Sequence, residues 1–431
     1  MSFWVLPAAM GLMAILLSFA LMTVDNAVDF DTSADRAWIF TSSGDGARSV
    51  LSTIAGSMIT VAGVVLSSMV VVLTLASQQF GPRLVRNFIK DYPSQFVIGA
   101  FTGCFLYNIL VLRTIGASED SFVPHISVLV GLFLAVLCIG GLIFFVHHVS
   151  VTIQVQSIMR RVKADLDEAI EEMFPNTIAA DPDEAASAII DGSKRFERDG
   201  GPLKASRSGY LQAIREDRLL ELCQKHDCLL RIHARPGDFV VRDEIIGELN
   251  CNNAKGDDSY KAIRKTFVIG KFPTCEQDVL FPINQLEEMA IRALSPGIND
   301  PHTAMECVDY LTASLCTLIT RPWPNPNRYD ADARLRVIAE PYGFDRILRE
   351  AFQQLHYYGR NDIAVVCRIV RALTKLATLN PTDADRRMAI ESFLNEIVEK
   401  SQKQLPHKTE INQLNQVYAT CSKTIDTASD Q

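Results

Sequence analysis

The stretch IAGSMITVAGVVLSSMVVVLTLA, residues 54–76, decides the fold, because it is a long apolar run without a charged side chain. About 17–25 apolar residues in succession cross a lipid bilayer as an α-helix. Comparable runs lie at residues 3–22, 96–112 and 126–146. The sequence therefore predicts a transmembrane domain of four helices in residues 1–150.

The composition agrees with a membrane protein. The chain is 48% hydrophobic, with 21% charged residues, and its mean hydropathy is +0.12. Soluble proteins carry a charged fraction nearer a quarter. The net charge of −8 gives no basic surface for nucleic acid, so nucleic acid is not an expected partner.

The basic residues between the runs predict the orientation. The segment 25–52 carries five aspartates against Arg36 and Arg48, whereas GPRLVRNFIKDYP, residues 81–93, and the segment after the fourth run are basic. Basic loops stay in the cytoplasm, so both termini and the C-terminal region are expected there. The first run could also be a signal peptide, but it is too long and lacks a basic start, which favours a retained helix.

The second run carries one narrow stripe of small and hydroxylated residues. Its pore-lining candidates recur at helical spacing: Thr53, Thr60, Gly63, Ser67 and Thr74. Small residues let helices approach closely, and hydroxyls bond across the contact. The stripe is thus either a packing seam or the lining of a pore in an oligomer. No Asp, Glu, Lys or Arg lies within a predicted span, which disfavours a proton-coupled pump.

The remaining chain predicts a cytoplasmic α+β domain that is mostly helical toward its C-terminus. Apolar residues at 3–4 spacing continue the fourth helix as a stalk over residues 151–175, buried against its own domain or a neighbouring subunit. Residues 176–275 form a small α/β section, with a helix at 185–196 and a strand pair at 239–241 and 245–249. Residues 276–424 form a helical section, and residues 425–431 a disordered tail.

Ten cysteines are scattered along the chain. None forms C-x-x-C, and no Cys/His spacing fits a zinc site. They are interpreted as small core residues in a reducing compartment, where disulfides are rare. No metal and no cofactor is expected.

A second notable stretch is RALSPGINDPHTA, residues 292–304. Pro296 ends the preceding helix, Gly297 is free to turn left-handed, and Asp300 is placed as the N-cap of a helix starting at Pro301. The stretch is a helix corner, a ligand or ion site, or a catalytic loop. The ligand-site candidates here and just upstream are Asp278, Arg292, Asn299, Asp300 and His302.

The same stretch resembles the hallmark RALSPGINDPxTA of a bacterial family of predicted membrane proteins known as a domain of unknown function. Further matching segments are SQQFGPRLVRNF (77–88), SGYLQAI (208–214), RPGDFV (235–240) and GKFPTCEQD (270–278). Members often carry Arg-Thr before the Gln-Asp pair, where this chain has Phe272, Pro273 and Thr274. The resemblance implies a protein of the bacterial inner membrane with four spans and a cytoplasmic domain. It implies no activity.

Three functions follow as hypotheses. The first is a homo-oligomeric ion channel with the second span near the pore and a cytoplasmic regulatory domain. The second is a membrane-anchored sensor or scaffold whose cytoplasmic domain binds a ligand or partner. The third, a membrane hydrolase, ranks last because no P-loop, nucleophile motif or metal motif occurs, so the chain is not expected to be an enzyme. The expected partners are the bilayer, further copies of the chain and an unidentified ligand.

Overall fold

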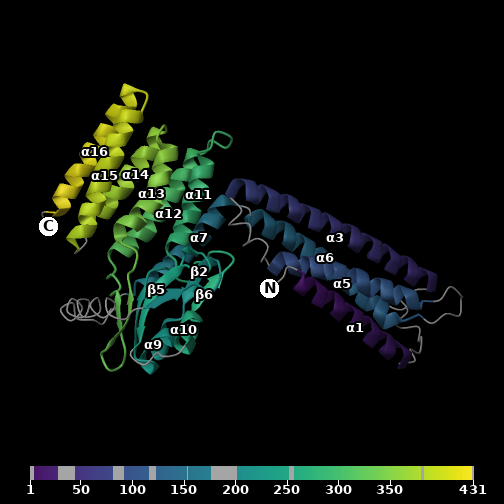
Figure 1. Cartoon of the computed structure of the whole chain (residues 1–431). Helices are drawn as coiled ribbons and strands as arrows, with labels where there is room; N and C mark the ends of the chain where they lie inside the picture. The colour runs from purple at the N-terminus through teal and green to yellow at the C-terminus, as the bar shows by residue number, and fades with distance from the viewer. Residues whose placement is uncertain are drawn as a thin grey trace. The chain divides into compact units, whose positions relative to one another are not determined.

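A computed structural model describes residues 4–27, 44–80, 92–115, 123–152, 154–175, 201–251, 257–379 and 383–429 (Figure 1). The chain divides into two compact units, Met1–Ile158 and Met159–Gln431. The first is built from helices alone in its described residues, and the second combines two sheets with a set of helices.

The first unit confirms the four predicted spans. They are α1 (Val5–Ala27), α3 (Gly44–Phe80), α5 (Tyr92–Thr114) and α6 (His125–Thr152), each long and apolar enough to cross a membrane. Helix α5 packs against all three others. Its buried residues include Val97, Phe101, Cys104 and Val111. They are spaced by four, three and seven residues, which aligns them along one side of the helix.

Helix α1 is longer than the predicted span and carries Asp25 in its last turn. This carboxylate is 4% exposed. It accepts hydrogen bonds from the backbone N–H groups of Ile126 and Ser127 at 2.9 and 3.0 Å and from the Ser127 hydroxyl at 2.6 Å. These N–H groups begin α6 and lack partners within that helix. Asp25 therefore acts as a cap that ties the end of α1 to the start of α6.

The second unit contains two sheets. The larger has the order β1-β5-β3-β8-β7 and the smaller the order β4-β2-β6. Among the described strands, β3 and β8 alone pair in parallel, and the other pairs are antiparallel. The strands are β1 (Gly201–Lys204), β2 (Gly209–Ile214), β3 (Cys228–Ile232), β4 (Phe239–Val240), β5 (Ile245–Cys251), β6 (Phe267–Gly270), β7 (Asn327–Tyr329) and β8 (Leu335–Ala339). Two short helices, α9 (Glu216–Lys225) and α10 (Asp257–Arg264), accompany them.

Two sequence predictions for this section are wrong. The strands near 239–241 and 245–249 do not pair with each other, because β4 joins β2 in one sheet and β5 joins β1 and β3 in the other. The chain changes sheets at Asp243, which has a left-handed φ of 67°. The cysteines are also not all free: Cys228 and Cys251 face each other across β3 and β5 and form a disulfide.

Helix α7 (Val155–Met173) corresponds to the predicted stalk, and its apolar stripe is buried, as Val162, Leu166 and Ile170 show. Met159 on this stripe is buried, and its sulfur lies 3.4 Å from that of buried Cys307, so the stripe is covered at least in part by the second unit itself. The stalk does not simply continue the fourth span, because α6 ends at Thr152, α7 begins at Val155, and Gln154 belongs to neither helix. Residue 153 and the predicted helix 185–196 lie outside the described residues.

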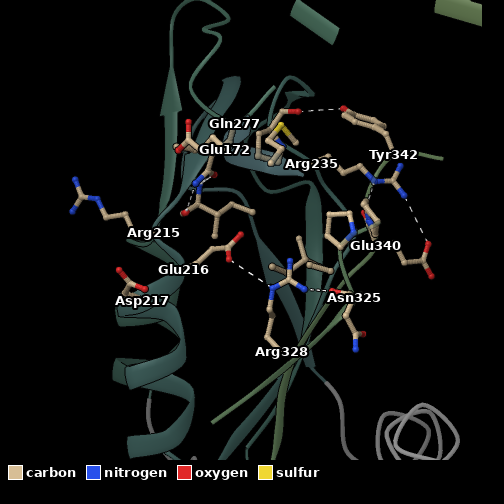
Figure 2. Close-up of a pocket in the computed structure, with 18 of the residues that line it drawn as sticks. Glu172, Arg215, Glu216, Asp217, Arg235, Gln277, Asn325, Arg328, Glu340 and Tyr342 are labelled. Carbon is tan, nitrogen blue, oxygen red and sulfur yellow. Dashed lines mark hydrogen bonds and ion pairs between the residues drawn. The ribbon is translucent and has the colours of Figure 1, made fainter. Parts of the chain in front are cut away.

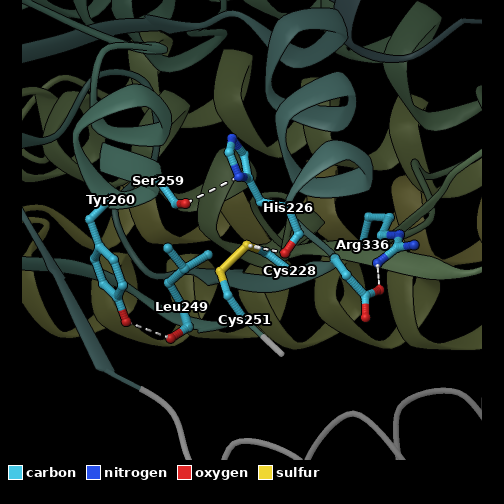
Figure 3. The surroundings of a disulfide bond; sticks show 8 residues. His226, Cys228, Leu249, Cys251, Ser259, Tyr260 and Arg336 are labelled. Carbon is cyan, nitrogen blue, oxygen red and sulfur yellow. Dashed lines mark hydrogen bonds and ion pairs between the residues drawn. A yellow bond between two sulfur atoms is a disulfide. The ribbon is translucent and has the colours of Figure 1, made fainter. Parts of the chain in front are cut away.

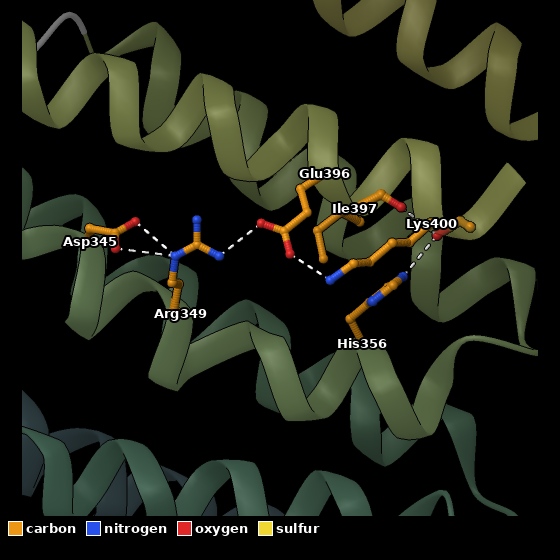
Figure 4. A network of polar contacts seen from close by, with 7 residues as sticks. Asp345, Arg349, His356, Glu396, Ile397 and Lys400 are labelled. Atoms are coloured by element: carbon orange, nitrogen blue, oxygen red, sulfur yellow. Dashed lines mark hydrogen bonds and ion pairs between the residues drawn. The ribbon is translucent and has the colours of Figure 1, made fainter. Parts of the chain in front are cut away.

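The remaining helices form the predicted helical section. They are α11 (Leu280–Ala293), α12 (Pro301–Ile319), α13 (Phe344–Gly359), α14 (Ile363–Thr378), α15 (Ala384–Gln404) and α16 (Lys408–Ser429). Arg349 of α13 pairs with Asp345 of its own helix at 3.0 Å and with Glu396 of α15 at 2.8 Å, and nearby His356 bonds Ser401 at 2.8 Å (Figure 4). These contacts fix α13 against α15.

The predicted disordered tail from residue 425 is wrong over most of its length, because α16 runs to Ser429. Three residues of this polar helix are buried: Leu414, Cys421 and Ile425. Their spacing of seven and four places them on one face, and α16 packs against α14. This contact explains why the helix extends well beyond the short helix that the sequence predicts at residues 411–417.

Candidate functional site

An open cavity of about 1000 Å³ lies in the second unit (Figure 2). It is bounded by the end of α7, the end of β2, the start of α9, the edge strand β7, and the segments that follow β3 and β8. Because β3 and β8 run in parallel, their carboxyl ends meet at one edge of the sheet, a common position for ligand sites in α/β proteins. Ile232 and Ala234 from one strand and Ala339 and Glu340 from the other line the cavity there.

Gln277 joins the end of β2 to the segment that precedes α11. Its side-chain oxygen accepts from the Ile214 N–H at 2.8 Å, and its amide nitrogen donates to the Ile214 carbonyl at 3.2 Å. The side chain thus continues the end of β2 much as another strand would. It fixes the segment before α11 to the wall of the cavity.

The lining carries charges of both signs. The basic residues are Arg215, Arg218, Arg235 and Arg328, and the acidic residues are Glu172, Glu216, Asp217, Glu276 and Glu340. Figure 2 shows Arg328 between Glu216 and Asn325, and Arg215 pointing away from the other labelled side chains.

The ion pairs in this lining are long and partly exposed. Arg328 lies 3.7 Å from the Glu216 carboxylate, and Arg235 lies 3.8 Å from that of Glu340. Pairs of this kind contribute at most about 1 kcal/mol. A bound charged group can therefore replace either partner at little cost.

The turn at residues 235–238 forms a rigid wall of the cavity. The Arg235 N–H donates to Asp238 at 2.8 Å, and the Tyr342 hydroxyl donates to the Pro236 carbonyl at 3.2 Å. The guanidinium of Arg235 also lies 5.1 Å from the centre of the Tyr342 ring, within the range of a cation–π contact. Burial raises the pKa of the Tyr342 hydroxyl, with help from Asp238 and Asp278, so this group stays protonated as a donor.

Asp278 lies directly behind this turn and is 4% exposed. It accepts from the Leu280 N–H at 2.9 Å at the start of α11. A Cβ at Gly237 would fall 2.4 Å from one of its carboxylate oxygens, and Gly237 has a φ of +96°. Burial raises the pKa of Asp278 to about 7, and the negative charges of Asp238 and Glu350 add to the rise.

The predicted ligand residues do not form one group. Asp278 precedes α11, whereas Arg292 is in its last turn; at 1.5 Å per residue the 14-residue helix separates them by about 20 Å. Arg292 pairs with Glu288 of its own helix at 3.0 Å. Only Asp278 lies near the cavity.

The other three candidates sit at the corner between α11 and α12. Asp300 accepts from the Thr303 N–H at 3.1 Å and the Thr303 hydroxyl at 2.6 Å, so it is the N-cap predicted for α12; these bonds lower its pKa. The left-handed residue is Asn299, with φ 51°, and not the predicted Gly297. His302 is exposed. The geometry is that of a capped corner between packed helices.

The stripe on α3 lies on the surface of the first unit. Thr53, Thr60, Gly63, Ser67 and Thr74 are all exposed. The hydroxyls of Thr53, Thr60 and Thr74 each donate to the carbonyl four residues earlier, at 2.7–2.8 Å. A shallow groove of about 600 Å³ runs along this face and is lined by Thr60, Gly63, Val64, Ser67, Ser68, Val71 and Val72.

The sequence did not identify any residue that lines the cavity as functional. It identified only Asp278, which lies behind the cavity wall. RPGD and EPYG are recognisable turns, and the structure brings Arg235, Pro236, Glu340 and Tyr342 of these turns together. Only the pairing of β3 with β8 makes the two turns neighbours. Among the described residues, no three His, Cys, Asp or Glu side chains are grouped to hold a metal ion.

Four membrane helices followed by a separate α+β unit with an open cavity define an integral membrane protein with a second, α+β unit. The chain belongs to the family described as predicted membrane protein (DUF2254), whose model matches residues 1–375.

Two relatives have the same degree of similarity. They are the uncharacterized protein Mb1321c of Mycobacterium bovis and the uncharacterized protein Rv1290c of Mycobacterium tuberculosis, each 30% identical over 413 residues. The match covers 94% of this chain and 77% of each relative. No solved structure matches the chain.

Proposed function

We propose that this membrane protein binds a small polar ligand in the cavity of its second unit. The observation that carries the proposal is the cavity of about 1000 Å³ at the carboxyl ends of β3 and β8. It is as large as typical sites for small molecules. Its walls are held by the Gln277 bridge and the 235–238 turn, so the site needs little reorganisation to bind.

The charges of the lining favour a ligand that carries both a cationic and an anionic group, such as an amino acid or a short peptide. Arg328 and Arg235 offer planar donors that suit a carboxylate. Glu172 and Glu276 offer carboxylates for an amine. Backbone carbonyls hold both guanidiniums in place, that of Asn325 for Arg328 and that of Glu340 for Arg235. A bound carboxylate therefore needs to replace only the long pairs with the Glu216 and Glu340 carboxylates.

A binding screen tests this function. The full chain in detergent is titrated with glutamate, arginine, the dipeptide arginyl-glutamate and, for comparison, ATP, and binding is followed by calorimetry. The zwitterionic probes are expected to bind, and Arg328→Ala is expected to weaken the dipeptide by about tenfold, or 1.4 kcal/mol.

The matched control is Arg368→Ala, which removes an exposed arginine paired with Asp309 at 3.5 Å, outside the lining of the cavity. It is expected to bind the dipeptide as the unsubstituted chain does. Equal weakening by both substitutions, or no binding of any zwitterionic probe, contradicts the proposed site.

We propose that this binding unit lies on the cytoplasmic side of the bacterial inner membrane, because basic residues follow the fourth span where the unit begins. In this arrangement the four helices anchor the domain, and no catalytic step is assigned to it.

A second candidate function is a homo-oligomeric conduit with α3 near its centre. The groove along Thr60, Gly63 and Ser67 supports it, because small residues let a helix from another copy approach closely. The hydroxyls of Thr53, Thr60 and Thr74 already donate to carbonyls of their own helix. This argues against a pore in which they bind water. They fit a dry contact between copies equally well.

Cysteine crosslinking decides between these arrangements. A Ser67→Cys variant in native membranes is expected to give a dimer on oxidation if α3 meets another copy, whereas Ile143→Cys on exposed α6 serves as the control. Conductance of the purified oligomer in planar bilayers then distinguishes a conduit from an anchor. A monomer in both membranes and detergent excludes the conduit.

A further inference from the structure

Cys228 and Cys251 occupy opposed positions at one end of the β3–β5 ladder (Figure 3). Cys228 is the first residue of β3 and Cys251 the last of β5, and their sulfur atoms are bonded across a sequence separation of 23 residues. Cys228 is fully buried, whereas Cys251 is partly exposed.

The strand pair does not depend on the disulfide for its register. Four further positions of β3 and β5 are paired, from Leu229 with Asn250 to Ile232 with Gly247. Leu230 and Leu249 in this ladder are fully buried. The two thiols of a reduced chain therefore stay opposed, and the bond can open and close without unfolding of the sheet.

Helix α10 is docked at the same end of the ladder. The Tyr260 hydroxyl donates to the Leu249 carbonyl at 3.0 Å, and the Ser259 hydroxyl lies 3.2 Å from Nδ1 of His226 (Figure 3). His226 is two residues before Cys228, and Leu249 is two residues before Cys251. The contacts that hold α10 thus rest on the two backbone segments that the disulfide joins.

We propose that Cys228 and Cys251 form a reversible dithiol–disulfide pair that couples the thiol redox state around the second unit to the docking of α10. A disulfide in a reducing compartment is usually transient or redox-sensing, and the basic segments place this unit in the cytoplasm. The inference rests on that placement and not on the ligand of the cavity.

The chemistry is thiol–disulfide exchange with a small thiol such as glutathione. A glutathione thiolate attacks the accessible sulfur of Cys251, and the sulfur of Cys228 leaves as a thiolate and takes a proton. A second glutathione thiolate attacks the mixed disulfide and releases Cys251. The protein disulfide and two thiols become a protein dithiol and one glutathione disulfide, so that atoms and electrons balance.

The test begins with cells that express the full chain. Thiols are trapped in acid and labelled before and after reduction with two different alkylating reagents, and the Cys228 and Cys251 peptides are quantified by mass spectrometry. The pair is expected to be mainly reduced in unstressed cells, to oxidise on treatment with diamide, and to return after its removal. Exposed Cys275 serves as the internal thiol control.

The purified chain in detergent supplies the second measurement. In glutathione buffers the ratio of disulfide to dithiol is expected to rise roughly tenfold for each tenfold rise in [GSSG]/[GSH]². Hydrogen exchange of residues 257–264 is expected to be faster in the reduced form and in Cys251→Ser, but unchanged in the control Cys275→Ser.

Three results overturn the proposal. The first is a Cys228–Cys251 pair that stays oxidised in unstressed cells, together with labelling of Cys275 by a membrane-impermeant maleimide added outside the cell. These two results together would make the disulfide a structural bond in an oxidising compartment. Another is a pair that diamide does not oxidise. The third is a pair that cycles without any change of exchange in α10, which removes the coupling.

Discussion

At the scale of single residues, the turn at residues 235–238 and Asp278 behind it are the most constrained part of the cavity wall. Gly237 adopts a φ of +96° and leaves no room for a Cβ beside the Asp278 carboxylate. Asp278 is buried and still begins α11 by accepting from the Leu280 N–H. The wall of the cavity and the start of α11 therefore both depend on the close approach of Gly237 to Asp278.

Gly237→Ala is expected to destabilise the protein by roughly 1–3 kcal/mol, because it adds left-handed strain and a clash with Asp278. The matched control is Gly297→Ala, since a Cβ there meets nothing within 4 Å and Gly297 has no positive φ. Thermal unfolding of the full chain in detergent measures both variants. Equal midpoints for the two would show that the 235–238 turn is not constrained by Asp278.

The raised pKa of Asp278, about 7, makes its ionisation unfavourable in the folded protein. Below the unfolded value of 3.8 both states hold the proton and the group has no effect. As the pH rises toward 7, the unfolded state loses its proton first, so stability falls, by up to roughly 4 kcal/mol.

Asp278→Asn is expected to remove this loss, because asparagine keeps a capping oxygen without the charge. Unfolding midpoints of the full chain at pH 5 and pH 8 measure it. Asp300→Asn is the control of opposite sign: the pKa of Asp300 is lowered, so its carboxylate stabilises above the unfolded pKa and that contribution is lost in acid. A pH profile of Asp278→Asn that matches the unsubstituted chain contradicts the buried acid.

At the scale of elements, the sequence predicts what is local and misses what depends on distant partners. The four spans follow from apolar runs alone, and the cap at Asp300 follows from Asp-Pro before a helix. The strand pair at 239–241 and 245–249 fails because β4 finds its partner in Gly209 and Tyr210, which no local pattern indicates. The cavity is equally hidden, because its walls come from segments that are distant in the sequence and meet through the β3–β8 pairing, Gln277 and the contacts of Tyr342.

The contact of α13 with α15 is expected to loosen in acid. His356 is 5% exposed, and burial lowers its pKa to about 4 from 6.5, with Lys400 and Arg360 adding to the fall and Glu396 opposing it. Above pH 6.5 the ring is neutral in both states. As the pH falls, the unfolded state gains a proton first, so stability falls by up to roughly 3 kcal/mol by pH 4.

His356→Gln is expected to flatten this acid branch, since a neutral amide does not titrate. The midpoint of thermal unfolding is followed between pH 7 and pH 4, with exposed His302→Gln as the control. An acid branch that persists in His356→Gln but disappears in His302→Gln would assign the effect to the other histidine.

At the scale of the whole molecule, the two units differ in their structure. The first spans the membrane around α5 and exposes the hydroxyl and glycine face of α3. The second holds the cavity, the disulfide and the helical section. The family match to residues 1–375 includes all four membrane helices and every residue that lines the cavity, so the proposed binding site lies within the part of the chain that defines the family.

Hydrogen exchange of the full chain in detergent, with and without saturating arginyl-glutamate, tests the central claim most directly. Binding in the cavity predicts slower exchange at residues 213–218, 234–236, 325–329 and 339–342, and loss of this protection in Arg328→Ala but not in Arg368→Ala. Protection confined to other segments, or equal exchange with and without the dipeptide, contradicts a ligand site at the carboxyl ends of β3 and β8.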